Sequence, residues 1–198
     1  MKGIIHVGLY DFPEHDCYTK LVGTRVVGVE ANKFVYDTMA KPVADECGYL
    51  CFNECLYSED GLKKQFFLAN DCSTLNPVAY SAHLSAKLSR GSYVDVTTKK
   101  LSTLIEENNI DMNQYDFLNI DVEGAELAAI RSAYKLFNKH FVDNVVVEFG
   151  PPSRWRRTLN MAPSVAIKVM TEMTNKYKCE DYQTVSYTHL TLPTNREV

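Results

Sequence analysis

Residues 117–127 read FLNIDVEGAEL, an apolar run that ends in an aspartate and is followed by an acidic turn containing a glycine. Such a run is typical of a strand buried on both faces. Three further runs have the same form, namely IIHVG at 4–8, RVVGVE at 25–30 and NVVVEF at 144–149. Because segments with helical spacing separate these runs, the sequence predicts an α/β fold: a Rossmann-like domain with a doubly wound, mostly parallel sheet.

The remaining elements follow from the same patterns. Asn32 is placed to cap a helix that turns Phe34, Val35, Thr38 and Met39 toward the sheet, and Pro42 should disturb that helix. A polar loop at 70–92 is long enough to be functional. The other predicted strands are 49–53, 63–68 and 93–97. Three further helices are predicted from apolar residues that fall on one face. The first carries Leu101, Leu104 and Ile105, the second Leu127, Ile130, Tyr134 and Phe137, and the third Val165, Val169, Met173 and Tyr177.

Size, charge and cysteine spacing exclude several classes of protein. The chain has 198 residues, which favours one domain, and a net charge of -4 argues against a general binder of nucleic acid or of membrane surfaces. Cys47, Cys51 and Cys55 recur every fourth residue without a C-x-x-C pair, so no metal site is predicted. Buried or free thiols in a reducing compartment are expected, and the protein is predicted to be cytoplasmic.

The last stretch, VSYTHLTLPTNREV at 185–198, has no pattern that fits the rest of the chain. It resembles translated sequencing-adapter read-through. We therefore expect a single domain over residues 1–184, a non-native or disordered tail over 185–198, and a natural chain that continues with the final strands of the sheet.

The candidate functional residues are those that directly follow the predicted strands, because an open parallel sheet binds its ligands beyond the carboxyl ends of its strands. Glu30 follows Gly8 by 22 positions. An acidic residue at this distance, at the tip of the second strand, can accept hydrogen bonds from both hydroxyls of a ribose. A solvated acid at a strand end is the alternative. Five further candidates for the site follow strand ends, namely Ala31, Asn32, Asn53, Asp121 and Glu123, and Glu54 and Glu148 follow strand ends as well.

The loop after Gly8 reads LYDFPEH and lacks the second and third glycines of a dinucleotide-binding loop. A close approach of backbone to two phosphates is therefore not expected, which disfavours a nicotinamide-dependent oxidoreductase. A ligand with a ribose and no pyrophosphate fits better, and S-adenosylmethionine is such a ligand.

Asp121 and Glu123 each allow two interpretations. Acidic residues in a first helical turn are stabilised by the helix dipole, by about 0.3–1 kcal/mol, and this covers Glu123 and Glu126. It covers Asp121 less easily, because Asp121 ends the strand itself. We therefore predict a catalytic role for Asp121 and retain Glu123 as a second candidate.

Together, IIHVG, VVGVEAN, NECLYSEDG, the serine of DCSTLN, IDVEGAEL and VVVEFG resemble the FkbM-type S-adenosylmethionine-dependent methyltransferases, over about Lys2 to Gly150. The resemblance implies a class I methyltransferase fold and methyl transfer to a hydroxyl of a sugar or natural-product-like acceptor. It implies cofactor roles for Gly8 and Glu30 and site roles for Asp121 and Glu123.

The chain departs from that family at Phe12 and Pro13, where members usually keep a second glycine in the first loop. The alternative function is therefore a non-catalytic nucleoside-binding module of the same fold. Titration with the cofactor separates the two functions.

Overall fold

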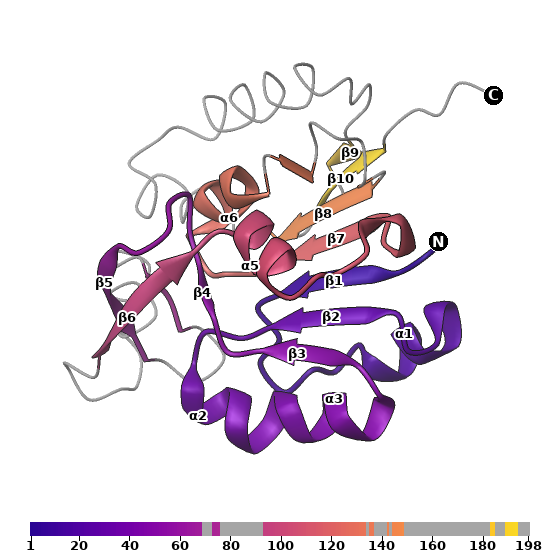
Figure 1. Cartoon of the computed structure of the whole chain (residues 1–198), viewed down its shortest axis with the longest axis horizontal. Helices are drawn as coiled ribbons and strands as arrows, with labels where there is room; N and C mark the ends of the chain where they lie inside the picture. The colour runs from indigo at the N-terminus through magenta and orange to yellow at the C-terminus, as the bar shows by residue number, and fades with distance from the viewer. Residues whose placement is uncertain are drawn as a thin grey trace.

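Five parallel strands form the centre of the molecule in the order β3-β2-β1-β7-β8 (Figure 1). Their bounds are Ile4–Val7 for β1, Val26–Val29 for β2, Leu50–Phe52 for β3, Phe117–Ile120 for β7 and Asn144–Glu148 for β8. The structure is a computed structural model that describes residues 1–68, 73–75, 93–133, 135–136, 142, 144–148, 183–184 and 189–193. The strand order reverses between β1 and β7, which makes their carboxyl ends the expected ligand site.

Helices cover both faces of this sheet, as the alternation of side chains along its strands requires. Ile5 and Val7 of β1 pack in a core cluster with residues of α5 (Leu101–Glu107) and α6 (Glu126–Ser132). Ile4 packs in a second cluster with residues of α1 (His15–Val22) and α3 (Lys41–Cys47). The doubly wound, mostly parallel sheet predicted from the sequence is therefore confirmed.

A second, smaller sheet stands beside the carboxyl ends of β1, β2 and β3 (Figure 1). It consists of β4 (Cys55–Leu56), β6 (Tyr93–Lys99) and β5 (Lys63–Phe67), with β6 in the middle. β5 and β6 pair antiparallel, whereas β4 and β6 pair parallel. The runs at 63–68 and 93–97 were predicted as strands, but the two-residue β4 is too short to leave a periodic signal.

The helix after β2 is capped by Asn32, as predicted, but it turns a different face to the core. The Asn32 side chain accepts hydrogen bonds from the backbone N–H groups of Phe34 and Val35 at 3.1 and 3.4 Å. Val35 is buried, whereas Phe34 is 68% exposed and Thr38 is exposed. The prediction that Phe34 and Thr38 face the sheet is therefore wrong.

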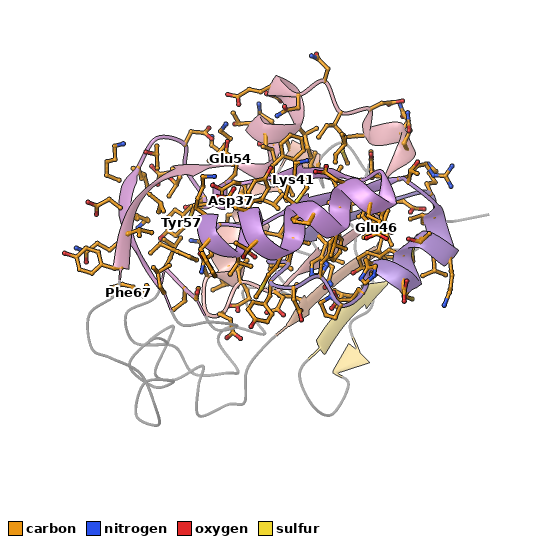
Figure 2. The ribbon with its side chains drawn as sticks, turned by 90° about the horizontal axis from the view of Figure 1, so that it is seen from below. Asp37, Lys41, Glu46, Glu54, Tyr57 and Phe67 are labelled. Atoms are coloured by element: carbon orange, nitrogen blue, oxygen red, sulfur yellow. The ribbon has the colours of Figure 1, made fainter. Side chains whose placement is uncertain are left out.

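The reason lies in the π-helical turn η1 (Tyr36–Ala40), which joins α2 (Lys33–Val35) to α3. Pro42 has no N–H to give the carbonyl four residues before it, so the chain widens there and continues as a helix. The wide turn shifts the helical phase and brings Ala40 and Ala44 into the core. Figure 2 looks onto this helix, with Asp37, Lys41 and Glu46 along it.

Two stretches form structure that the sequence did not predict. Helix α1 buries only Tyr18 and Val22, which is too short a stripe to stand out in the sequence. Residues His189–Pro193 form β10, antiparallel to β8, and Gln183–Thr184 form β9 beside it. The expected tail at 185–198 therefore contains a strand, because its short His-Leu-Thr-Leu alternation pairs with the open edge of β8.

Several predictions lie outside the described residues: the helix at 163–177, positions 134 and 137 of the helix after β7, and the loop at 70–92 apart from 73–75. Within the described residues, no helix has the length and apolar character needed to cross a membrane. The cysteines described, Cys17, Cys47, Cys51 and Cys55, are free thiols. No described group of three or more His, Cys, Asp or Glu side chains could hold a metal ion.

Candidate functional site

A pocket opens where the carboxyl ends of β1, β2 and β7 meet the small sheet. Five of the seven residues predicted from the sequence line it, namely Gly8, Glu30, Ala31, Asp121 and Glu123. They come from three strand ends that are far apart in the sequence. The strand order of the sheet brings them together, as expected for a switch point.

Gly8 lies where the backbones that follow β1 and β7 touch. Its φ is +89°, and a Cβ atom at this position would lie 1.6 Å from the carbonyl oxygen of Asp121. The Gly8 N–H donates to the carbonyl of Val29 at 2.8 Å, and the Asp121 N–H donates to that of Val7 at 2.8 Å. Any side chain at position 8 would therefore push the β7 end away from β1.

The carboxylate of Glu30 is 7% exposed and binds the backbone around it. Oε2 accepts hydrogen bonds from the N–H groups of Leu9 and Tyr10, both at 3.0 Å, and Oε1 accepts from Asn32 at 2.7 Å. Burial raises the pKa of Glu30, and these backbone hydrogen bonds oppose that rise. The backbone of Ala31 contributes to the same effect, so the carboxylate is held mainly by backbone donors at the edge of the cavity.

Asn32 and Asn53, the other two residues predicted from the sequence, do not line the pocket. Besides capping its helix, Asn32 donates from Nδ2 to the Ser73 hydroxyl at 3.3 Å. Asn53 donates from Nδ2 to the carbonyls of Glu30 and Ala31, at 2.8 and 3.3 Å. These hydrogen bonds join both side chains to the loop that carries Glu30, so they support that loop.

Asp121 and Glu123 line the cavity from a tight turn between β7 and α6. Glu123 has a φ of +50° and Gly124 a φ of +97°, so two consecutive residues are left-handed. A non-glycine residue in this region is uncommon and costs about 1–2 kcal/mol. The turn is therefore held by its surroundings, and both residues line the pocket from it.

Phe12, one of the residues that depart from the family pattern, is fully buried and does not line the pocket. Its ring contacts those of His6, Tyr18 and Tyr49, with centroids 5.8, 6.0 and 5.8 Å away. Pro13 is exposed. The substitution of the expected glycine therefore fills the core beneath α1 and leaves the cavity open.

The small sheet and the segment before it supply the lining residues Glu54, Cys55, Leu56 and Phe66, and the loops after β1 and β5 supply Tyr10 and Ser73. The sequence singles out Glu54 as a strand-end residue and Ser73 as part of the family resemblance, but it gives no site role to Tyr10, Cys55, Leu56 and Phe66. Burial raises the pKa of the Cys55 thiol to about 12, so it lines the cavity as a neutral, weakly polar group. Of these four, Cys55 and Leu56 lie in the NECLYSEDG string of the resemblance, whereas Tyr10 and Phe66 leave no such signal in the sequence.

The charged side chains that line the pocket, among the described residues, are all carboxylates: Glu30, Glu54, Asp121 and Glu123. Lys99 does not line the pocket, and its Nζ donates to the carboxylates of Glu54 at 2.7 Å and Glu107 at 2.9 Å. Figure 2 labels Glu54, which lies toward the end of the molecule that carries Tyr57 and Phe67. Such a lining attracts a cationic ligand and repels a pyrophosphate.

Comparisons with known proteins agree with this geometry. Residues 6–177 match the sequence family described as the methyltransferase FkbM domain. The fold is similar to the methyltransferase domain of bacterial CtHen1, with a TM-score of 0.53 and 11% identity over 98% of this chain and 90% of that one. It is also similar to the METTL16 methyltransferase domain, with a TM-score of 0.51 and 10% identity over 99% of this chain and 61% of that one. No curated protein matches the sequence.

Proposed function

Because the chain belongs to the FkbM methyltransferase domain family and has a class I methyltransferase fold, we propose that it transfers a methyl group from S-adenosylmethionine to a hydroxyl of a small-molecule or glycan acceptor. The observation that carries the proposal is the acidic pocket at the switch point of the sheet. Its carboxylates complement the sulfonium and ammonium charges of this cofactor. They oppose the negative pyrophosphate of a dinucleotide.

The residues around the pocket fit the parts of this cofactor. Glu30 lines the cavity at the end of β2, where its carboxylate can accept a hydrogen bond from a ribose hydroxyl. Gly8 and Ala31 present little or no side chain, so a ligand can approach the backbone beside them. When bound, the cofactor supplies an electrophilic methyl carbon on a positively charged sulfur.

Asp121 is the residue we assign to the acceptor. Its carboxylate orients the acceptor hydroxyl and takes the proton that the hydroxyl releases as its oxygen bonds to the methyl carbon and the bond from that carbon to sulfur breaks. Glu123 lies two residues on in the same turn and adds negative charge beside the hydroxyl. Beyond this proton transfer, the reaction needs alignment of the three reacting atoms.

Calorimetric titration of the full chain with S-adenosylmethionine, S-adenosylhomocysteine and NAD tests the cofactor assignment. We expect heat with the first two ligands and none with NAD. Absence of binding to both sulfur compounds would overturn the proposal. A pocket that binds them and transfers no methyl group to any hydroxyl acceptor would instead identify the non-catalytic nucleoside-binding module.

The Asp121→Asn variant tests the catalytic assignment. We expect its affinity for S-adenosylhomocysteine to stay within a few fold of the unmodified protein, while turnover falls by roughly 10²–10⁴, the usual effect of losing a general base. Turnover is measured with methyl-labelled S-adenosylmethionine and saccharide acceptors. Full turnover in the variant removes Asp121 from the mechanism.

A further inference from the structure

Thr74 and Glu126 hold opposite sides of a single peptide group beside the pocket. The Thr74 hydroxyl donates to the carbonyl oxygen of Glu123 at 2.6 Å. The Glu126 carboxylate accepts from the N–H of Gly124 at 2.6 Å. That carbonyl and that N–H belong to the same peptide bond, so both of its polar groups are bound by side chains.

The clamped peptide group lies at a sterically unfavourable point of the backbone. It joins the two left-handed residues of the turn between β7 and α6, and one of them, Glu123, carries a side chain. If this peptide plane rotated, Glu123 would change its position in the lining of the cavity. Asp121 lies immediately before the turn, and its N–H donates to the carbonyl of Val7. A rotated peptide would therefore leave Asp121 held by β1 alone and no longer by the turn that follows it.

Both side chains that hold the peptide are themselves fixed. Thr74 is 0% exposed and Glu126 is 5% exposed. The backbone of Thr74 pairs with Phe67 of β5 in both directions, at 2.8 and 2.9 Å. Thr74 is thus anchored on the small sheet, and Glu126 is anchored on α6.

The same short segment also reaches the other side of the pocket. The Ser73 hydroxyl accepts a hydrogen bond from Asn32, whose N–H binds Glu30. Residues 73–75 therefore connect the loop that carries Glu30 with the turn that carries Asp121 and Glu123. Ser73 and Leu75 line the cavity on this path.

From this geometry we infer that Thr74 and Glu126 are positioning residues, which clamp the Glu123–Gly124 peptide and thereby hold Asp121 and Glu123 for methyl transfer. The inference rests on the proposed function for its chemistry. The clamp itself is a property of the described residues. Asp121 and Glu123 act on the ligand, whereas Thr74 and Glu126 act through the turn that carries them.

The test compares two buried threonines whose hydroxyls each donate to a backbone carbonyl. Thr74→Val removes the half of the clamp that binds the Glu123 carbonyl, and Thr74→Ser keeps the hydroxyl. The matched control is Thr98→Val, because Thr98 is 2% exposed, donates to the carbonyl of Glu59 at 2.7 Å and does not line the pocket. Hydrogen exchange of the Gly124 amide, melting temperature, affinity for S-adenosylhomocysteine and turnover are measured on the full chain.

We expect Thr98→Val to lose at least as much stability as Thr74→Val, because the Thr98 hydroxyl also accepts a hydrogen bond from the Leu62 N–H at 3.1 Å. Only Thr74→Val should speed hydrogen exchange of the Gly124 amide, by roughly tenfold. In Thr74→Ser this amide should exchange at the rate of the unmodified chain. The turnover of Thr74→Val should fall by about tenfold or more, while the affinity of this variant for S-adenosylhomocysteine stays within about threefold of that of the unmodified chain. Unchanged exchange at Gly124 in Thr74→Val, or equal loss of turnover in both valine variants, overturns the inference.

The two proposals fail in different ways. If the unmodified chain binds neither S-adenosylmethionine nor S-adenosylhomocysteine, the proposed function fails while the exchange data still report on the clamp. If binding and turnover are present and exchange at Gly124 does not respond to Thr74→Val, the function stands and the clamp fails.

Discussion

The carboxylate of Glu30 has two tasks at the residue scale, because it lines the cavity and also binds three backbone N–H groups. From the sequence alone it reads as an acid at a strand tip whose removal leaves folding nearly unaffected. The structure changes that expectation. Loss of the side chain leaves the N–H groups of Leu9, Tyr10 and Asn32 without this acceptor in a nearly buried place.

We predict that Glu30→Ala weakens binding of S-adenosylmethionine by about 1.5–3 kcal/mol and lowers the free energy of unfolding by about 1–3 kcal/mol. Relief of the buried charge offsets part of the second loss. Glu46→Ala is the control, since Glu46 is an exposed acid on α3. Titration calorimetry and denaturant unfolding measure the two effects. Unchanged stability in Glu30→Ala would show that its backbone contacts do not support the loop.

At the scale of elements, the loop between β1 and α1 depends on an aromatic cluster. Tyr10 and Phe12 have φ of +48° and +58°, values that favour glycine. The ring of Phe12 is buried against His6, Tyr18 and Tyr49 and holds this conformation. Packing replaces the conformational freedom that a second glycine would give to the same loop.

The Phe12→Ala variant should therefore lose about 3–5 kcal/mol of stability, as buried aromatic residues do when truncated. Phe12→Gly should be no less stable than Phe12→Ala, because glycine tolerates the positive φ. Phe34→Ala on α2 is the control and should change stability by less than about 0.5 kcal/mol, since Phe34 is 68% exposed. Urea unfolding curves test the order. A Phe12→Ala loss as small as that of Phe34→Ala contradicts the packing argument.

At the scale of the whole molecule, a polar group is enclosed between the central strand and α1. His6 is 2% exposed, and burial lowers its pKa to about 4. Asn119 donates from Nδ2 toward Nε2 at 3.1 Å, and Nδ1 lies 3.3 Å from the Tyr18 hydroxyl. Glu14 lies 3.9 Å from Nδ1. Neutral His6 thus links β1, β7 and α1.

This histidine makes stability depend on pH. The unfolded chain protonates His6 below about pH 6.5 and the folded chain only below about pH 4, so the unfolded state binds more protons between these values. Stability should fall as pH drops through that window, by about 3 kcal/mol from His6. Unfolding free energies of the unmodified chain and of His6→Gln should converge toward pH 4. Parallel pH profiles would contradict the assignment.

The sequence by itself determined the strands β1, β2, β7 and β8, the α/β class and the strand ends at Gly8, Glu30 and Asp121. Burial imposes a local pattern, and a polar residue at the end of an apolar run remains visible without any partner. The cap at Asn32 was equally local, because its hydrogen bonds reach only two and three residues along the chain.

The tertiary structure alone decided which distant groups meet. Thr74 lies 49 residues from Glu123, and the contact of Gly8 with Asp121 exists because β1 pairs with β7. The roles of Asn53 and Phe12 also depend on neighbours from other elements. Periodicity records how deeply a residue is buried, whereas hydrogen bonds and ring contacts between elements depend on the relative placement of strands, which a single sequence does not encode locally.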